Sequence, residues 1–451
     1  MEPFRHHIFV CTQEKPEGVT SCPGNGSLRL LQALERELSS QGLDNEVQVT
    51  TCGCLGLCDD GPIMIAYPGG VWYHKVKEED VPEIVESHLR SGRVVSRLAW
   101  TDSEAMKAQA TEHRDRYRAM VKARDEAGVL PDDLNEMIRA FMSSRAVLTA
   151  LELDVFTAVG SGASAAQVAE SIHADSRAAE MLLNALVALG LVTKSGGIYS
   201  NTADSARFFV RDSKDNHRNG LLHTANIWHR WSTLTDAVRH GTCIPIDRES
   251  TSEWTVNFIA GMDRNARARA PLVVQALGTA GVHRVLDLGG GSGAYSIAFA
   301  KASPDVRCEI LDVPEVVPLT TEYVNKAGVS AQVSLRPGDM LTDDLGSGYD
   351  IIMLNAICHM FSGEQNQQLF RRARQALAPN GRLVVQDFIL NSDKTGPLHA
   401  ALFSLNMLVA TDHGASYNEN EYSSWMKNAG FADISRIKLP GPSDLIVAVA
   451  K

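Results

Sequence analysis

The stretch from Val285 to Gly293 constrains the fold of this 451-residue chain more strongly than any other segment. Its apolar residues run into a cluster of glycines, and a helix-forming segment from Ala294 to Ala300 follows directly. This order predicts a buried strand, a tight turn and the start of a helix. Glycines allow the turn to pass directly beneath a ligand, and the free N–H groups of the helix start favour anionic groups. The stretch therefore predicts a nucleotide-type binding loop in an α/β domain.

A second apolar segment, Glu309 to Asp312, supports the same interpretation. It ends in an acid about nineteen residues after the last glycine, where a carboxylate can accept hydrogen bonds from a ribose diol. The glycine spacing alone does not identify the ligand, because Gly289, Gly291 and Ala294 also match the pattern of NAD-binding loops. Motifs later in the chain decide whether the ligand is NAD or another nucleoside cofactor.

In these motifs the chain resembles the S-adenosylmethionine-dependent O-methyltransferases of the plant caffeate and bacterial hydroxyneurosporene type. The resemblance rests on the run Asp-Leu-Gly-Gly-Gly-Ser-Gly from Asp287, on Leu-Asp-Val-Pro from Leu311 and on Gly-Asp-Met from Gly338. It covers roughly residues 130–451 and implies a class I Rossmann-like methyltransferase domain over residues 281–451.

The resemblance also implies where S-adenosylmethionine would bind. Asp339 and Met340 suit an adenine ring, because the carboxylate can accept from the exocyclic amine and the thioether can pack on the ring face. The cofactor-binding residues expected on this basis are Asp287, Gly289, Gly291, Asp312, Asp339, Met340 and Asn355.

A histidine after the predicted fourth strand, Tyr349 to Leu354, suits base catalysis. Methyl transfer from a sulfonium needs an aligned and deprotonated acceptor, and an imidazole is a natural base for a phenol or similar hydroxyl. His359 matches the family's catalytic histidine, and Asp387 matches the glutamate that orients it and stabilises the imidazolium. A lone histidine could merely cap a loop, but the surrounding fold landmarks favour catalysis.

The sequence departs from the family's pattern at two positions near this histidine. Asn355 stands where the family carries a lysine or arginine that contacts the cofactor, so another donor must make that contact. Ser416 stands where the family carries a second glutamate. Base activation would then be weaker, or the acceptor would be more acidic than a simple phenol.

Two side chains upstream of the glycine turn, those of Phe258 and Met262, are expected to line the acceptor pocket. Met262 matches a family methionine that packs against the substrate ring, and Phe258 lies about one helical turn before it. Most apolar residues of this region are core residues by base rate, so the expectation is limited to these two.

Residues 96–280 are expected to form a linker helix and a helical, winged-helix domain. A helix-turn-helix pattern runs from Ser164 to Leu186, and Gly196 to Tyr199 would form the wing. DNA binding fits poorly, because Arg177 is the only basic residue of the would-be recognition helix. The methyltransferase family carries a winged-helix dimerisation domain at this place, which implies a homodimer.

Five of the eight cysteines lie within the first 58 residues, and this clustering indicates a metal site, because disulfides are rare in a reducing cytosol. The spacing of the cysteines, with Gly61-Pro62 and the Tyr-Pro-Gly-Gly-Val-Trp-Tyr run from Tyr67, resembles the thioredoxin-like 2Fe–2S ferredoxins over residues 1–95. Four thiolates are what a 2Fe–2S cluster needs. The ligands implied by the resemblance are Cys11, Cys22, Cys54 and Cys58.

Two alternatives stay open for the cysteine site. Four cysteines could hold a structural zinc ion, although zinc ribbons usually offer two short C-x2-C pairs and ten residues separate the first pair here. Cys52 could replace Cys54 as a ligand, but the spacing from Cys54 to Cys58 is the one that matches the family.

Composition restricts the partners of the chain. A net charge of −11 argues against a nucleic-acid partner held by phosphate contacts. The N-terminal residues lack the apolar run of a signal peptide, and no uncharged stretch is long enough to span a bilayer. A cytoplasmic protein without a membrane partner is therefore expected.

The sequence thus predicts a homodimeric O-methyltransferase that acts on a small, aromatic hydroxyl acceptor and carries an iron–sulfur domain of redox, docking or structural role. An electron-transfer partner would suit the cluster, although methyl transfer itself exchanges no electrons. Methylation at sulfur or carbon on the same fold is the first alternative. The second is a non-catalytic, redox-sensing protein that binds S-adenosylmethionine.

Overall fold

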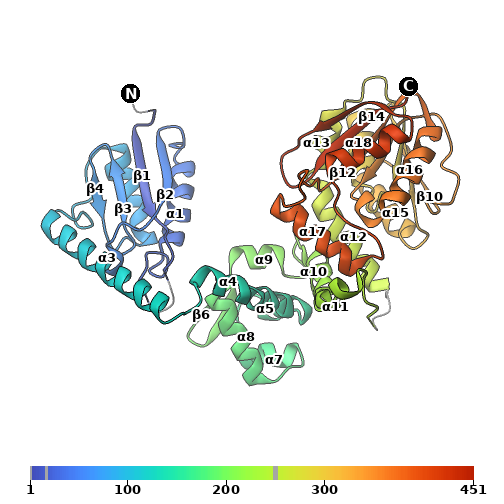
Figure 1. The fold of residues 1–451 in the computed structure, drawn as a ribbon. Helices are drawn as coiled ribbons and strands as arrows, with labels where there is room; N and C mark the ends of the chain where they lie inside the picture. Colours follow the sequence, from blue (N-terminus) through green and yellow to red (C-terminus); the bar gives the residue numbers. More distant parts are fainter. Residues whose placement is uncertain (1–2, 16–18, 247–251) are drawn as a thin grey trace. The chain divides into compact units, whose positions relative to one another are not determined.

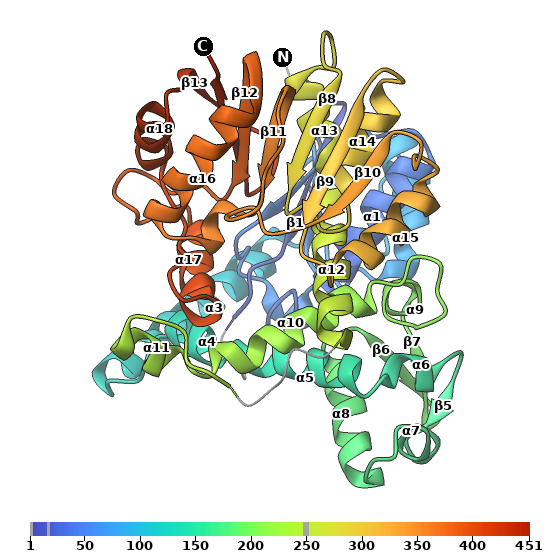
Figure 2. The same ribbon diagram turned by 90° about the vertical axis from the view of Figure 1, so that its right-hand side faces the viewer.

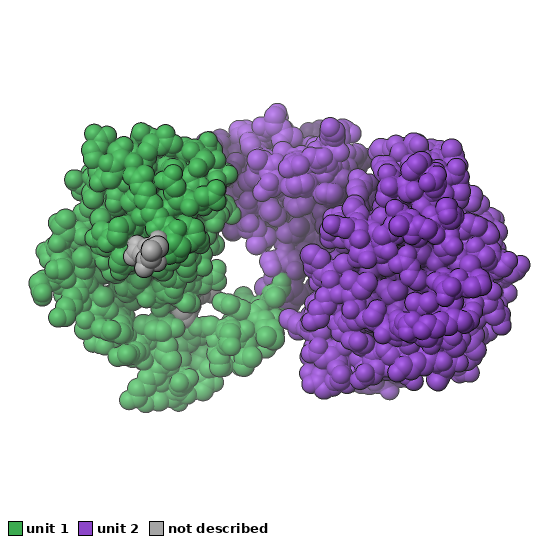
Figure 3. Space-filling view, turned by 90° about the horizontal axis from the view of Figure 1, so that it is seen from above, with its two compact units in different colours: residues 1–140 green, residues 141–451 purple. Residues whose placement is uncertain are grey.

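The structure is a computed structural model that describes residues 3–15, 19–246 and 252–451. The chain divides into two compact units, Met1–Ala140 and Phe141–Lys451 (Figure 3). Among the described residues, no helix combines the length and the apolar character needed to cross a bilayer.

The first unit is built on a four-stranded mixed sheet (Figure 1). Its central strand β1 pairs in parallel with β2 and antiparallel with β3, and β3 pairs antiparallel with β4. Alternate residues of β1, Ile8 and Val10, are fully buried beside three leucines of α1, so this face of the sheet forms the core. In sheet order the strands are β2 (Val47–Cys52), β1 (His6–Cys11), β3 (Met64–Tyr67) and β4 (Val71–Tyr73), and α1 spans Ser27–Ser40.

Helices complete this unit after the sheet. The helical segment after the sheet begins as α2 (Val81–Glu83) and continues as a wider π-helix over Ile84–Arg90. The long helix α3 (Ser103–Glu126) follows, with the Asp102 side chain accepting a hydrogen bond from the Ala105 N–H at its start. The last helix of the unit is α4 (Asp132–Arg139).

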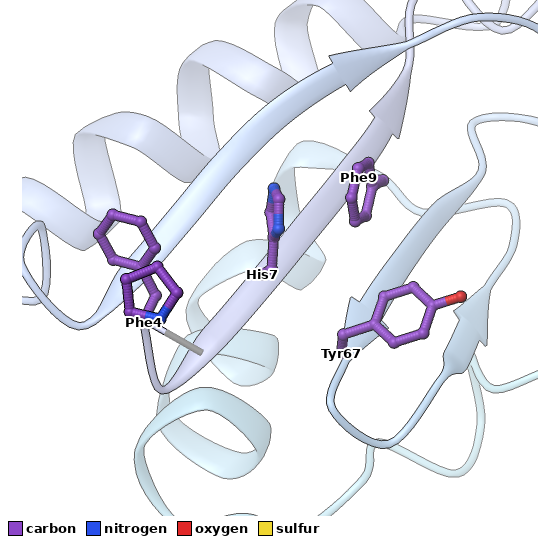
Figure 4. Close-up of a pocket in the computed structure, with 5 residues that line it drawn as sticks. Phe4, His7, Phe9 and Tyr67 are labelled. Atoms are coloured by element: carbon purple, nitrogen blue, oxygen red, sulfur yellow. The ribbon is translucent and has the colours of Figure 1, made fainter. Parts of the chain in front are cut away.

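The opposite face of this sheet carries an aromatic hollow of about 430 Å³ (Figure 4). His7 and Phe9 of β1 stack with ring centroids 4.2 Å apart, and Tyr67 of β3 meets Phe9 edge to face. Phe4 and Pro3 complete the lining. The hollow lies toward the start of β1, whereas Cys11 ends that strand.

The second unit begins with the winged-helix region. Its core includes Leu183 and Leu186, both fully buried, and Tyr199 of the β6–β7 hairpin. Asp154 takes a left-handed conformation with φ of 59° and separates α5 from α6. The elements are α5 (Phe141–Glu152), α6 (Val155–Val159), β5 (Ala163–Ser164), α7 (Ala165–Ser171), α8 (Ser176–Ala188), β6 (Val192–Ser195), β7 (Ile198–Asn201) and α9 (Ala203–Phe208).

Four further helices precede the main sheet, and α17, which comes later in the chain, contacts two of them, α10 and α11. The Trp231 indole donates to the Asn406 side chain across 2.8 Å and so joins α10 to α17. These elements are α10 (Arg218–Trp231), α11 (Leu234–His240), α12 (Ser252–Arg267), α13 (Ala270–Leu277) and α17 (Leu398–Ala410).

A seven-stranded sheet in the order β10-β9-β8-β11-β12-β14-β13 forms the centre of the second unit (Figure 2). All neighbouring strands are parallel except at β14, which runs opposite to both of its neighbours. The strands are β8 (Arg284–Leu288), β9 (Arg307–Asp312), β10 (Val333–Pro337), β11 (Tyr349–Asn355), β12 (Leu377–Asp387), β13 (Ala432–Ile437) and β14 (Asp444–Val449).

Helices cover both faces of this sheet, as expected for a doubly wound fold. One buried cluster packs α13, α14 and α15 against the sheet, and another packs α16 and α18 against the other face. The helices are α14 (Ala294–Ala302), α15 (Val317–Ala327), α16 (Gly363–Ala376) and α18 (Glu419–Asn428). The carboxyl ends of β8, β9, β11 and β12 therefore meet at one edge.

The pairing of β11 with β12 is irregular at one point. Pro379 to Gly381 form an irregularity inside β12, which already pairs with β11 at Leu377. The end of β14 holds this segment, because the Asn380 N–H donates to the Ala450 carbonyl and the Ala450 N–H donates to the Gly381 carbonyl.

Replacing a central leucine tests how far the second unit depends on this sheet. Leu286 is fully buried in β8 between β9 and β11, so Leu286→Ala should lower the free energy of unfolding by about 2–5 kcal/mol. Hydrogen–deuterium exchange of the β8 and β11 peptides measures this loss. Val238→Ala, on an α11 residue that is 60% exposed, is the control and should change it by less than about 0.5 kcal/mol. Unchanged protection in Leu286→Ala would contradict the central position of β8.

Candidate active site and cysteine site

The glycine turn after β8 is packed so closely that it leaves no room for a side chain at Gly289. A Cβ atom there would lie 2.5 Å from Ile357 Cδ1 and 3.0 Å from Met340 Cε, and the backbone has φ of 67°. Ile357 stands two residues before His359, and Met340 follows β10. The turn thereby brings together the loops after three different strands.

Gly291, in the same turn, faces more open space. Its φ is 58°, and the atom nearest to a Cβ at this position would be Ile259 Cδ1 of α12, at 3.8 Å. The Gly291 N–H donates to Asp312 Oδ2 across 2.8 Å, and the Val313 N–H donates to Asp312 Oδ1 across 2.8 Å. Burial raises the pKa of Asp312, while these two hydrogen bonds lower it. Each carboxylate oxygen keeps a second lone pair for a ligand.

Asp287 lies beneath the turn and is fully buried. It accepts hydrogen bonds from the Ser296 hydroxyl at 2.8 Å and from the Asn355 amide at 3.4 Å. Burial raises the pKa of Asp287 to about 6, and the bonds from Ser296 and Asn355 counteract part of this rise. The Asn355 Oδ1 atom has no hydrogen-bond partner among the described residues, although the side chain is buried. An unpaired buried oxygen of this kind can accept from a ligand.

Asp339 is more exposed than the other predicted cofactor residues. Its Oδ1 accepts from the Leu341 N–H at 2.7 Å, and its own N–H donates to Asp343 at 2.9 Å. The structure therefore brings Asp287, Gly289, Gly291, Asp312, Met340 and Asn355 together around the turn, with Asp339 at the solvent side of the same loop as Met340.

His359 and Asp387 form a buried pair at the same edge of the sheet. His359 Nδ1 lies 2.7 Å from Asp387 Oδ1, and the two side chains are 7% and 2% exposed. The His359 N–H also donates to Asp387 Oδ2, at 3.1 Å. Because the carboxylate accepts only, Nδ1 carries the proton and Nε2 presents a lone pair. Nε2 has no hydrogen-bond partner within the described part of the chain.

Asp387 accepts two further hydrogen bonds that sequence motifs did not indicate. The Tyr422 hydroxyl donates to Oδ2 at 2.9 Å, and the Phe388 N–H donates to Oδ1 at 2.8 Å. Burial raises the pKa of Tyr422 well above its usual value, so this phenol remains a donor. The sequence indicates no role for Tyr422 beyond its position on α18, an amphipathic helix.

Two aromatic side chains, Phe403 and Phe388, lie beside the buried imidazole. Phe403 of α17 meets the His359 ring edge to face at 4.7 Å, and Phe388 stacks obliquely on Phe403 at 4.3 Å. Gly414 follows α17 and packs against the backbone of His359. A Cβ at this position would lie 2.4 Å from the His359 carbonyl oxygen, so no side chain fits there. Ser416, two residues further on, is buried, and its hydroxyl has no partner among the described residues.

The two predicted pocket residues lie on α12, apart from this aromatic group in sequence. Phe258 stacks on Trp254 with centroids 5.4 Å apart, and it meets His223 of α10 edge to face at 5.1 Å. Burial, with help from Arg264 and Arg230, lowers the pKa of His223 to about 4. Met262 lies one turn along α12 and is partly buried. His223 was not indicated by any motif.

Four cysteines converge in the first unit. Cys54 Sγ and Cys58 Sγ lie 3.4 Å apart, and Cys11 and Cys22 are 1% exposed in one small core. A hydrogen bond from Cys22 lowers the pKa of Cys11, and hydrogen bonds from Cys22 and Cys54 lower that of Cys58. Cys22 thus interacts both with Cys11 and with Cys58, which in turn contacts Cys54. The sulfur paired with Cys58 is that of Cys54, whereas Cys52 ends β2 opposite Cys11.

Both sites fit the groups that the sequence suggested. Four cysteines, of which Cys11, Cys22 and Cys58 are buried and Cys54 is partly buried, offer the ligand set of a 2Fe–2S cluster. The glycine turn, the Asp312 carboxylate and the unpaired Asn355 oxygen offer the donor and acceptor groups that a nucleoside needs.

Three family models match the chain. They describe a thioredoxin-like [2Fe–2S] ferredoxin over residues 2–89, an O-methyltransferase dimerisation domain over residues 135–211 and an O-methyltransferase domain over residues 231–432.

Individual proteins resemble the second and third of these regions. The 3-hydroxy-5-methyl-1-naphthoate 3-O-methyltransferase of Streptomyces sahachiroi is 30% identical over 71% of this chain and 95% of that protein. The tetracenomycin polyketide synthesis 8-O-methyl transferase of Streptomyces glaucescens is 30% identical over 70% of this chain and 96% of that protein. Human N-acetylserotonin methyltransferase in complex with SAM (S-adenosylmethionine) matches with a TM-score of 0.62 at 26% identity, over 70% of this chain and 96% of that chain. The chain therefore belongs to the S-adenosylmethionine-dependent O-methyltransferases, and its residues 2–89 form a thioredoxin-like [2Fe–2S] ferredoxin domain.

Proposed function

We propose that this enzyme methylates the hydroxyl of a small aromatic acceptor and that His359 is its general base. The observation that carries the proposal is the 2.7 Å bond between His359 Nδ1 and Asp387. With Nδ1–H held by the carboxylate, the Nε2 lone pair can take the acceptor's proton as the new C–O bond forms. Asp387 would then stabilise the imidazolium and keep the ring in one tautomer.

The residues around the glycine turn would hold S-adenosylmethionine, whose sulfonium supplies an activated methyl group. Asp312 is placed to accept from a ribose diol, and Met340 to pack on an adenine face. The Asn355 oxygen can accept from the amine end of the cofactor, because it lacks a partner among the described residues. The family carries a cationic side chain at this position, which donates to the cofactor. The Asn355 oxygen accepts instead, so the direction of the hydrogen bond to the cofactor is reversed.

An aromatic acceptor fits the rings near His359. Phe403 and Phe388 border the imidazole, and flat apolar surfaces of this kind bind a planar ring well. We infer that Phe258 and Met262 add a further wall from α12. Relatives that are named for methylating a hydroxynaphthoate and a tetracenomycin intermediate support an aromatic hydroxyl rather than a thiol or carbon acceptor.

We further propose that the enzyme works as a homodimer. The matched dimerisation region includes a run of large apolar side chains that are exposed in the single chain. Met137 is 73% exposed, Ile138 65% and Phe141 50%, which is unusual for residues that are not in an interface.

The ferredoxin domain suggests a cytoplasmic enzyme that exchanges electrons with a partner protein. Its ligands must remain thiolates, which a reducing compartment favours. The cluster is not a reactant in methyl transfer, so an electron-transfer partner would act on the domain separately from the chemistry at His359.

Removing the base should abolish most of the turnover without weakening cofactor binding. His359→Ala should lower kcat by about 10²–10⁴-fold, and Asp387→Asn should lower it through the wrong tautomer. The measurement combines methyl transfer to a panel of phenols with calorimetric binding of S-adenosylmethionine. The lost activity should return as the pH approaches about 10, where a phenol ionises without help.

Tyr422→Phe is the matched control for this dyad. It removes one of four hydrogen bonds to Asp387 and leaves the imidazole contact in place, so kcat should fall by much less than in Asp387→Asn. Full activity of His359→Ala at neutral pH, or a product methylated at carbon or sulfur, would refute the proposal.

Asp312→Asn should weaken cofactor binding rather than the chemical step. The change removes a charged acceptor, which is worth about 1.5–3 kcal/mol, so the Kd for S-adenosylmethionine should rise about ten- to a hundred-fold. Asp305→Asn alters an exposed aspartate just before the same strand and should leave the Kd unchanged. Equal Kd values for both variants, measured by calorimetry, would remove Asp312 from the cofactor site.

Charges placed in the exposed apolar run should separate the dimer. The double variant Met137→Glu, Ile138→Glu should elute with the mass of one chain, 49.0 kDa, in light scattering, whereas the unaltered protein should show twice that mass. Val238→Glu introduces the same charge on an exposed α11 residue and should leave the dimer intact. A dimer that persists in the double variant would contradict this interface.

A further inference from the structure

Helix α3 belongs to the cysteine site, although it lies beyond the residues that match the ferredoxin family. The family match ends at residue 89, and α3 spans Ser103–Glu126. Its side chains Met106 and Ala110 nevertheless pack against the small core that contains Cys11 and Cys22. A Cβ at Gly56, between two of the cysteines, would lie 3.0 Å from the Ala110 Cβ. The helix therefore covers the cysteine loop at van der Waals distance.

Two polar contacts fix α3 over this loop. The Gln109 amide donates to Asp60 Oδ2 at 2.7 Å, and the Arg116 guanidinium donates to Asp59 Oδ2 at 3.2 Å. Both aspartates directly follow Cys58. Because residues three and four apart share a helix face, Met106, Gln109, Ala110 and His113 all lie on the side that meets the cysteines.

His113, a polar residue of this helix face, lies beside the sulfurs of Cys54 and Cys58. One of its ring nitrogens and the sulfurs of Cys54 and Cys58 all lie within 4.8 Å of one another. The side chain is 5% exposed, and its Nε2 has no hydrogen-bond partner among the described residues. A buried imidazole nitrogen without a partner is costly, so a ligand at the cysteine site is its natural partner.

The number of thiols indicates that His113 donates a hydrogen bond rather than binding iron. Four cysteines supply the two thiolates that each iron of a 2Fe–2S cluster requires, and a tetrahedral iron has no place for a fifth ligand. A ring N–H can still donate to a ligating sulfur, which carries negative charge. Such a bond is stronger in the reduced cluster, which holds one more electron.

We propose that His113 donates an N–H hydrogen bond to the sulfur of Cys54 or Cys58 in the loaded cluster and thereby raises its reduction potential. This chain would then differ from a ferredoxin that ends at residue 89, because a helix outside the matched domain sets the electronic state of the cluster. His113 is a positioning and tuning residue, not a ligand.

The test compares two His113 variants with a buried histidine elsewhere in the same unit. His113→Phe fills the space without a donor, and His113→Gln retains an N–H. His88→Phe is the control, because His88 is 6% exposed but bonds to the Tyr73 hydroxyl at 2.9 Å instead of facing the cysteines. The full-length protein is purified anaerobically. Its midpoint potential is measured by mediated titration, and the dithionite-reduced cluster is examined by electron paramagnetic resonance with nitrogen hyperfine spectroscopy.

We expect His113→Phe to shift the midpoint potential to a more negative value and to change the g-values. His113→Gln should recover most of both shifts, and His88→Phe should cause neither. The nitrogen coupling of the unaltered protein should have the weak strength of a hydrogen bond. An unchanged potential in His113→Phe would overturn the proposal. A strong coupling of directly bound nitrogen, or loss of the cluster from both His113 variants but not from His88→Phe, would also overturn it in favour of ligation.

Discussion

The close packing at Gly289 is the constraint on which the catalytic unit depends. No side chain fits there, because Ile357 and Met340 fill the space that a Cβ would need. This contact joins the turn after β8 to the loops after β10 and β11, so the proposed cofactor site and the loop that carries His359 form one packed edge. The doubly wound order of the sheet makes this possible, since it brings the carboxyl ends of those strands to the same side.

The buried Asp387 carboxylate is the second constraint, because it positions the base that we propose. It accepts from the His359 ring, from two backbone N–H groups and from Tyr422, so its position is determined from several elements at once. These hydrogen bonds hold the carboxylate in one orientation toward the His359 ring. Ser416 stands where the family carries a second glutamate, so Asp387 is the one acid that we propose orients His359.

The sequence allowed the fold class, the two cofactors and the enzyme class to be predicted, and the comparisons confirm them. Short local motifs made this possible, because glycines, an acid and cysteines at fixed spacing have few alternative roles. The roles of individual site residues and the boundaries at residues 95 and 280 stay predictions. Tyr422, His223 and His113 were missed, since each reaches its site from a distant helix and no local pattern marks it.

The helix over the cysteines has a consequence for how the protein matures. Cys11 and Cys22 are 1% exposed beneath side chains that α3 contributes to, so iron and sulfide have little access once that helix has docked. The four thiols are synthesised before α3 emerges from the ribosome, because they precede it in the chain. The sulfurs of Cys11 and Cys22 are therefore most open to iron and sulfide before α3 docks, which favours cluster insertion at an early stage of folding.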